Sequence, residues 1–266
     1  MSALTLSLRE PPPLPVDARA LCPGLAAAEL RALTLHCNGR PGRVEDWFRI
    51  SGDDPQRLVL EGDCRRFDGL GSAMAEGELI VDGNAGAWLG AGLRGGAIQV
   101  SGDCGDYAGA AMAGGTLRVR GSAGAWLGSA AAGERVGMRD GLIHVGGDAG
   151  PHAGDRLRRG IVVIDGDAGE AVAGRMIAGT LVIGGHTGAG LGRGMRRGTV
   201  LLHRAPVGLP ATFHDGGPRS LNVLALLRGA LAALDSPAAR FGDRVRRHLG
   251  DRAVAGLGEV LVLEEG

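Results

Sequence analysis

A histidine beside a carboxylate is the first feature of this sequence that could do chemistry. His214 and Asp215 are neighbours in the segment TFHDGGPR (212–219). A carboxylate can orient an imidazole ring and support general acid–base catalysis. The sequence contains no G-x-S-x-G nucleophile motif to accompany this pair. The pair alone is therefore weak support for an independent enzyme.

Metal-ligand spacing is absent among the histidines and cysteines. No two histidines lie at H-x-x-x-H spacing, and no two cysteines form C-x-x-C. The scattered residues are His36, His144, His152, His186, His203, His214 and His248, with Cys22, Cys37, Cys64 and Cys104. We expect lone histidines, reduced thiols and no metal site.

The elements that would position any site are internal repeats. GNAGAWLG (83–90) returns as GSAGAWLG (121–128), two periods of nineteen residues later. Five segments align without gaps: 79–97, 98–116, 143–161, 162–180 and 181–199. A copy from Leu117 carries seven extra residues near 130–137, one from Leu58 carries two, and a truncated copy starts at Val200.

Each copy opens with an apolar, variable, apolar triplet, such as Leu79 to Val81, and continues with glycines at fixed places. The alternation predicts a short strand with one buried face. Glycine inside a helix costs about 1 kcal/mol, so helical repeats fit poorly. We therefore predict an all-β fold, a parallel β-helix of seven to eight coils spaced ~4.8 Å apart. The general rule for parallel crossovers makes it right-handed.

Stacked coils place equivalent residues in columns. The fifteenth position is always methionine or leucine, and we expect it to face inward: Met74, Leu93, Met112, Met138, Leu157, Met176 and Met195. Four successive copies carry a ring at one position, which predicts a stack: Trp88, Tyr107, Trp126 and His152. This stack shields an apolar side or meets a partner. Polar residues after a corner glycine, such as Asp103 and Asp148, are interpreted as Asx-type turn residues.

A whole coil separates Cys64 from Cys104, both at the seventh position. Two coil spacings amount to ~9.6 Å, beyond the reach of a disulfide of about 7 Å. We predict that these two cysteines are not bonded.

Arginine is the second residue type that could do chemistry. All 29 basic residues are arginine, whose guanidinium pairs bidentately with carboxylates. Nine of them follow the twelfth position of a copy, so stacking predicts a basic strip: Arg94, Arg139, Arg156, Arg158, Arg159, Arg175, Arg193, Arg196 and Arg197. The candidate binding residues are Arg158, Arg159, Arg196 and Arg197, and no catalytic residue is assigned.

The ends of the chain differ from the repeats. We expect an N-terminal cap at 1–57, with a strand at 4–8 and a helix at 26–33. The glycine repeat occupies 58–202. A C-terminal cap at 203–266 is expected to hold helices at 221–234 and 237–250 and a strand at 258–266. GAGLRG (90–95) matches a dinucleotide-binding pattern, but its glycines belong to the repeat and no βαβ unit surrounds it.

Composition limits the classes of function. The formal net charge is +0, so no global charge attracts nucleic acid or an anionic membrane. No apolar run reaches the ~18 residues of a membrane span, and no signal peptide is apparent. We expect a cytoplasmic protein. Glycine makes up 50 of 266 residues, against a usual ~7%.

The motif G-x-x-G-x-x-x-G resembles a known family. It occurs as GNAGAWLG, GDCGDYAG, GSAGAWLG, GDAGPHAG and GHTGAGLG, after the lead-in DWFRISGD (46–53). Across 44–202 it resembles the glycine-repeat domain that closes the large subunit of glutamate synthase and forms the C-type subunit of formylmethanofuran dehydrogenase. A similar protein occurs in the bacterial formyltransferase/hydrolase complex, which the arginine-rich, lysine-free composition favours.

The resemblance implies a non-catalytic scaffold in cytoplasmic one-carbon metabolism (formaldehyde oxidation). The complex transfers the formyl group of formyl-tetrahydromethanopterin to a methanofuran-type carrier and releases formate. The implied partners are an amidohydrolase-like hydrolase subunit, a formyltransferase subunit and a B-type subunit. The arginine strip would meet acidic residues of a sister subunit, or the glutamate tail of the carrier, and no catalytic cofactor is expected. The alternatives are the C-type subunit of a tungsten or molybdenum formylmethanofuran dehydrogenase, and a solitary β-helix enzyme acting on carbohydrate.

Overall fold

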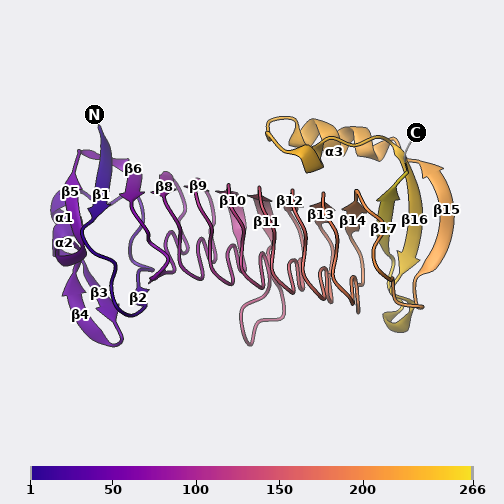
Figure 1. Ribbon diagram of the computed structural model, residues 1–266, viewed down its shortest axis with the longest axis horizontal. Coiled ribbons are helices and arrows are strands. Elements are labelled where there is room, and N and C mark those ends of the chain that lie inside the picture. Colours follow the sequence, from indigo (N-terminus) through magenta and orange to yellow (C-terminus); the bar gives the residue numbers. More distant parts are fainter. Residues whose placement is uncertain (1, 265–266) are drawn as a thin grey trace.

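One long sheet runs through the molecule (Figure 1). The computed structural model describes residues 2–264, so the last two residues of the expected strand and cap lie outside it. The 13-stranded sheet has the order β15-β16-β17-β14-β13-β12-β11-β10-β9-β8-β6-β1-β5, and a 4-stranded sheet has the order β4-β3-β2-β7. The fold is therefore all-β in its main part, with short helices near the two ends.

The elements follow one another along the chain in a simple order. The N-terminal segment contains β1 (Ala3–Leu8), β2 (Val16–Asp17), α1 (Ala27–Ala32), β3 (Thr34–Cys37), β4 (Arg40–Arg43), α2 (Val44–Trp47) and β5 (Phe48–Ser51). The repeats contain β6 (Asp54–Glu61), β7 (Phe67–Asp68), β8 (Glu78–Asp82), β9 (Ala97–Val100), β10 (Ala113–Val119), β11 (Asp140–Val145), β12 (Ile161–Ile164), β13 (Thr180–Ile183) and β14 (Thr199–Leu202). The C-terminal segment contains β15 (His214–Ser220), α3 (Val223–Leu231), β16 (Arg244–Gly250) and β17 (Gly258–Leu263).

Strands of neighbouring repeats pair in parallel, in the register that the sequence period predicts. Leu79 is opposite Ile98, one period of nineteen residues later. Leu117 is opposite Ile143, because the seven extra residues near 130–137 leave the sheet as a loop. A second ladder of single parallel bridges joins the seventh positions: Cys64, Ala85, Cys104, Ala123, Ala149, Ala168 and Thr187. The gapless alignment of the repeats is therefore confirmed.

The core is a continuous apolar column inside the repeats. The methionines and leucines at the fifteenth position are buried, as predicted: Met74, Leu93, Met112, Met138, Leu157, Met176 and Met195. The same cluster extends from Leu4 to Val260, so both ends of the chain pack onto the repeats. Gly96 illustrates the tight spacing, since its φ is +74° and a Cβ there would lie 2.5 Å from the carbonyl oxygen of Gly77.

The N-terminal segment covers the first repeat. β1 pairs in parallel with β6 and antiparallel with β5, so the main sheet continues into this segment. The predicted strand and helix are confirmed as β1 and α1. β2 joins the short strand β7 of the first repeat, which attaches the small sheet to the repeats.

The C-terminal segment differs from prediction in one element. The helix expected at 221–234 is confirmed as α3, and the strand as β17. The helix expected at 237–250 is wrong, since only Pro237–Ala239 forms a 3-10 turn and β16 follows. β16 pairs antiparallel with β17 from Val245 to Gly250 and thereby covers a strand that would otherwise expose its edge.

α3 covers the outer face of the sheet over part of its length (Figure 1). Val163, Val182 and Leu201 point outward from β12, β13 and β14 and are buried in one cluster with Leu224 and Leu231 of α3. The outer face of β8 to β11 lies beyond α3. None of the helices within residues 2–264 combines the length and apolar character needed to cross a membrane.

Candidate functional site

The four candidate arginines lie together. Arg158, Arg159, Arg196 and Arg197 are exposed and line a depression of about 440 Å³. Ile177, Ala178 and Gly179 of the intervening repeat form the rest of its lining, which contains no carboxylate. Two strand spacings separate the pairs, ~9.6 Å along the sheet. The arrangement can bind an extended chain of carboxylates, one per guanidinium pair.

Two other arginines of the predicted strip are used within the protein. Arg175 donates from Nε and Nη2 to the two carboxylate oxygens of Asp155, at 2.9 and 2.8 Å. Arg156 lies 3.9 Å from the same carboxylate, and its Nη1 donates to the carbonyl of Glu134 in the 130–137 loop at 2.5 Å. The strip predicted from nine arginines is therefore interrupted, because the buried Asp155 draws these two side chains to itself.

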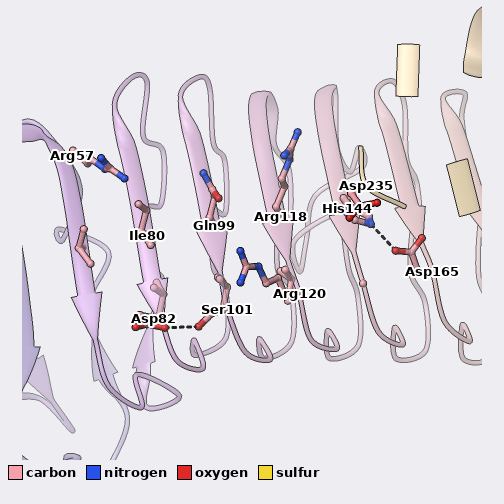
Figure 2. Close-up of a pocket in the computed structure, with 15 residues that line it drawn as sticks. Arg57, Ile80, Asp82, Gln99, Ser101, Arg118, Arg120, His144, Asp165 and Asp235 are labelled. Atoms are coloured by element: carbon pink, nitrogen blue, oxygen red, sulfur yellow. Dashed lines mark hydrogen bonds and ion pairs between the residues drawn. The ribbon is translucent and has the colours of Figure 1, made fainter. Parts of the chain in front are cut away.

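The open face of the sheet holds a polar groove (Figure 2). Its volume is about 770 Å³, and it is lined by Arg57 of β6, Ile80 and Asp82 of β8, Gln99 of β9, and Arg118 and Arg120 of the β10 repeat. These residues occupy the variable and outward positions of the repeats. At the second position of the repeats, which Gln99 and Arg118 occupy in the groove, Val163, Val182 and Leu201 are apolar and are buried where α3 covers the sheet.

A histidine, an aspartate and a serine meet at the α3 end of this groove. His144 Nε2 lies 2.8 Å from Asp165 Oδ2, and Ser236 Oγ donates to Asp165 Oδ1 at 2.5 Å. Ala238 N–H donates to the same oxygen at 3.2 Å. Burial opposes ionisation of Asp165, but the hydrogen bonds from His144, Ser236 and Ala238 outweigh it and hold its pKa below the usual range. Ser236 contacts the carboxylate rather than the imidazole, so the order of a serine–histidine–acid triad is not formed.

Sequence reasoning missed this cluster. Asp165 and Ser236 are 71 residues apart, and the sequence predicts His144 only as a lone surface histidine or one with a structural partner. The signal available is an ionisable residue at the second position of one repeat, His144, and an acid directly after β12 in the next repeat, Asp165. Conversely, the His214–Asp215 pair is not formed as an acid–base unit. Asp215 accepts from Arg246 instead, at 3.0 Å from Nε and 2.5 Å from Nη2.

The predicted ring stack is present. Trp88 and Tyr107 stack at 4.2 Å between ring centroids, Tyr107 and Trp126 at 5.8 Å, and Trp126 and His152 at 4.0 Å. All four side chains are half-buried. Their edges therefore form a continuous aromatic band along four repeats.

From Asn84 onward, the polar residues after the corner glycines bind backbone N–H groups of the next repeat. Asp103 N–H donates to Asn84 Oδ1 at 2.9 Å, and Ser122 N–H donates to Asp103 Oδ1 at 2.8 Å. Asp167 N–H continues the series with Asp148 Oδ1 at 2.7 Å. The Asx-turn interpretation is wrong for Asn84, Asp103 and Asp148, whose Oδ1 atoms accept from the next repeat, but it fits Asp63, whose Oδ1 accepts from the N–H of Arg65 at 3.3 Å.

The two cysteines of the repeats, Cys64 and Cys104, are buried thiols that ionise poorly. Burial raises the pKa of Cys64 and of Cys104 to about 12. Ala85 lies between them in the ladder, so the predicted register is confirmed and the two thiols are free. No group of three or more histidine, cysteine or acidic side chains within residues 2–264 is placed to hold a metal ion.

Comparisons with known proteins agree with this architecture. No protein-family model matches the chain. A curated relative, the C-type subunit of the formyltransferase/hydrolase complex Fhc of Methylorubrum extorquens, is 38% identical over 86 residues. That match covers 31% of this chain and about a third of the relative, 32% of its length.

A solved structure extends the similarity to the whole chain. It is the crystal structure of the formyltransferase/hydrolase complex (FhcABCD) from Methylorubrum extorquens in complex with methylofuran. One of its chains matches with a TM-score of 0.92 and 36% identity, over 98% of this chain and 100% of that chain.

The fold and its columns define an all-β glycine-repeat protein whose strands stack in one parallel sheet. Because identity and structure agree over the full length of a solved relative, the chain belongs to the family of subunits found in formyltransferase/hydrolase complexes. The name of the curated relative points to the C-type member of that family. The likeness to glutamate synthase stays a prediction.

Proposed function

We propose that this chain is the C-type scaffold subunit of a cytoplasmic formyltransferase/hydrolase complex. The full-length match to a chain of the FhcABCD structure carries this proposal. The complex moves the formyl group of formyl-tetrahydromethanopterin to a methanofuran-type carrier and releases formate. Its partners are a hydrolase subunit of amidohydrolase type, a formyltransferase subunit and a B-type subunit.

The chain itself contributes no catalytic residue in this proposal. Its polar groups have structural partners: Asp155 binds Arg175, and Asp165 binds His144 and Ser236. The column from Asn84 to Asp167 binds backbone N–H groups of the next repeat. These bonds support a role in holding a long rigid surface for other subunits.

The finer description of the fold belongs to the same proposal. We interpret the repeats as a right-handed parallel β-helix at 58–202, between an N-terminal cap at 1–57 and a C-terminal cap at 203–266. Two parallel ladders support this interpretation, one formed by the strands and one by the single bridges. In both ladders each residue pairs with the equivalent residue of the next repeat.

Two surfaces suit the sister subunits. The aromatic band from Trp88 to Trp126 offers stacked, half-buried rings, which are favoured at protein interfaces. The arginine quartet of Arg158, Arg159, Arg196 and Arg197 offers four guanidinium groups with no acid in its lining. Acidic residues of a sister subunit fit this quartet, and the glutamate tail of the carrier is the second occupant that its chemistry allows.

Reconstitution tests the proposal directly. The complex is expressed with and without this chain, and both its protein composition and the release of formate from the formylated carrier are measured. We expect the isolated chain to release no formate and the complex to lose subunits when the chain is omitted. Formate release by the isolated chain would contradict the scaffold role, and purification as a solitary protein active on glycans would contradict the whole assignment.

A further inference from the structure

A cavity of about 750 Å³ lies between the N-terminal segment and the first repeats. Trp88 and Ser72 line it from the repeats, and Asp17, Arg19 and His36 line it from the small sheet. Its volume is in the range of small-molecule sites. The scaffold role proposed above does not use this cavity.

The ring stack ends at this cavity because the equivalent residue of the preceding repeat is a glycine, as the backbone hydrogen bonds show. Trp88 N–H donates to the carbonyl of Asp106, the residue before Tyr107, at 2.7 Å. Gly69 N–H donates in the same way to the carbonyl of Ala87, the residue before Trp88, at 2.8 Å. Gly69 therefore occupies the place of a ring in the preceding repeat and has no side chain to offer.

Residue 69 cannot carry a ring, because the side chain of Arg19 lies against it. A Cβ on Gly69 would lie 2.3 Å from Cγ of Arg19, so a larger residue is excluded there. Tyr107 covers one face of Trp88, stacked at 4.2 Å with an interplanar angle of 2°. The other face has no ring neighbour in the preceding repeat, and Trp88 lines the cavity on that side.

Polar groups without partners surround the open indole face. Asp68 Oδ1 accepts from Ala87 N–H at 2.9 Å, whereas residues 2–264 give its Oδ2 no hydrogen bond. Ser72 Oγ is buried and has no hydrogen-bond partner in this part of the chain. Asp17 is opposite Asp68 in the β2–β7 pairing but already binds Arg19 through Nε at 2.9 Å.

The electrostatics of Asp68 favour a ligand that donates hydrogen bonds. Burial raises the pKa of Asp68, and the neighbouring charge of Asp17 raises it further. N–H donors placed against the carboxylate would satisfy Oδ2 and offset both effects. A flat ring over Trp88 would at the same time bury its open face.

We propose that this cavity binds a planar heteroaromatic ring that carries a ring N–H beside an exocyclic amino group. The ring stacks on Trp88 as the next member of the column. The two adjacent donors pair with the carboxylate of Asp68. Nothing in this inference depends on the function proposed above.

Guanosine and inosine form a matched pair of probes. Both present a purine ring with a ring N–H, but only guanosine carries the adjacent amino group. Binding is measured by equilibrium dialysis and by quenching of tryptophan fluorescence. The sample is the full-length chain, alone and with the subunits that co-purify. We expect saturable binding of guanosine and about tenfold weaker binding of inosine, the effect of one charge-assisted hydrogen bond.

Two conservative variants separate the site from general effects on the fold. Asp68→Asn keeps an oxygen for Ala87 N–H and replaces the free oxygen by a donor, so we expect guanosine to bind about tenfold more weakly. Asp106→Asn is the control, because Asp106 makes the equivalent bond to Ala125 N–H at 2.8 Å and does not line the cavity. Its affinity for guanosine should be unchanged.

Several outcomes would overturn the proposal. If guanosine and inosine bind equally, or if neither binds, the two adjacent donors do not pair with Asp68. Equal weakening in Asp68→Asn and Asp106→Asn would show an effect on the repeats rather than on a site. If guanosine binds the isolated chain but not the chain with its co-purified subunits, the cavity is part of a protein interface.

Discussion

Arg175 holds the buried carboxylate of Asp155 from the next repeat, with both guanidinium contacts at 2.8 to 2.9 Å. The side chain of Asp155 is 3% exposed, whereas that of Arg175 is 53% exposed. The pair therefore joins a buried charge to a guanidinium that water still reaches. The neighbouring Arg156 contacts the 130–137 loop of the preceding repeat through the carbonyl of Glu134.

Removal of Arg175 should destabilise the protein because it leaves the Asp155 carboxylate buried without its main partner. A fully buried pair costs about 3–5 kcal/mol to break, and solvent screening of Arg175 lowers this to about 2 kcal/mol. Arg175→Gln is compared with Arg94→Gln, an exposed arginine of another repeat, by urea unfolding. Equal free energies of unfolding for the two variants would show that the contact contributes nothing.

Asp165 should make stability depend on pH in the acid range. Its folded pKa is lowered, so the carboxylate contributes stability above the unfolded value of about 3.9 and loses it as pH falls through the folded pKa. Asp165→Asn, which retains an acceptor for Ser236, should be about 1 kcal/mol less stable at pH 7. The difference from wild type should shrink below about pH 4. A difference that stays constant from pH 7 to pH 3 would rule out this linkage.

The repeat architecture could be predicted because the sequence restates it many times. The spacing of nineteen residues, the methionine column and the positions of Trp88, Tyr107 and Trp126 all follow from one alignment, and packing in each repeat constrains the next. The register of Cys64 and Cys104 followed for the same reason.

The segments outside the repeats offered no such redundancy. The stretch 237–250 contains helix-forming residues, but the unpaired edge of β17 gives β16 more stabilisation than a helix could. The cluster of His144, Asp165 and Ser236 depends on where α3 and the following turn pack on the sheet, which local patterns do not encode. The position of Asp155 under Arg175 is likewise a contact between repeats that composition alone cannot show.

Cys64 and Cys104 should resist alkylation in the folded protein. Their thiols are buried and have a pKa of about 12, so the reactive thiolate is scarce at pH 8. Cys22 and Cys37 are only half-buried and serve as the internal comparison. Iodoacetamide labelling followed by peptide mass analysis should modify Cys22 and Cys37 first, and the other two after denaturation. Early labelling of Cys104 in the native protein would contradict the burial described here.

The arginine quartet should hold whichever acidic partner binds it through screened electrostatic contacts. Arg158→Gln/Arg159→Gln and Arg196→Gln/Arg197→Gln each remove one pair from the depression, and the quadruple variant removes both. Exposed ion pairs contribute about 0.2–1 kcal/mol each, so the quadruple variant should weaken the contact about tenfold or more. Retained carrier and co-purified subunits are measured at low salt and at about 0.5 M salt, where screening weakens the contact of the unmutated protein as well and narrows the difference from the variant. The adjacent pair Arg65 and Arg66 of the first repeat, exposed but outside the depression, supplies the charge-matched control. If the carrier content and the set of co-purified proteins stay unchanged at both salt concentrations, the quartet is a solvated surface and binds neither partner.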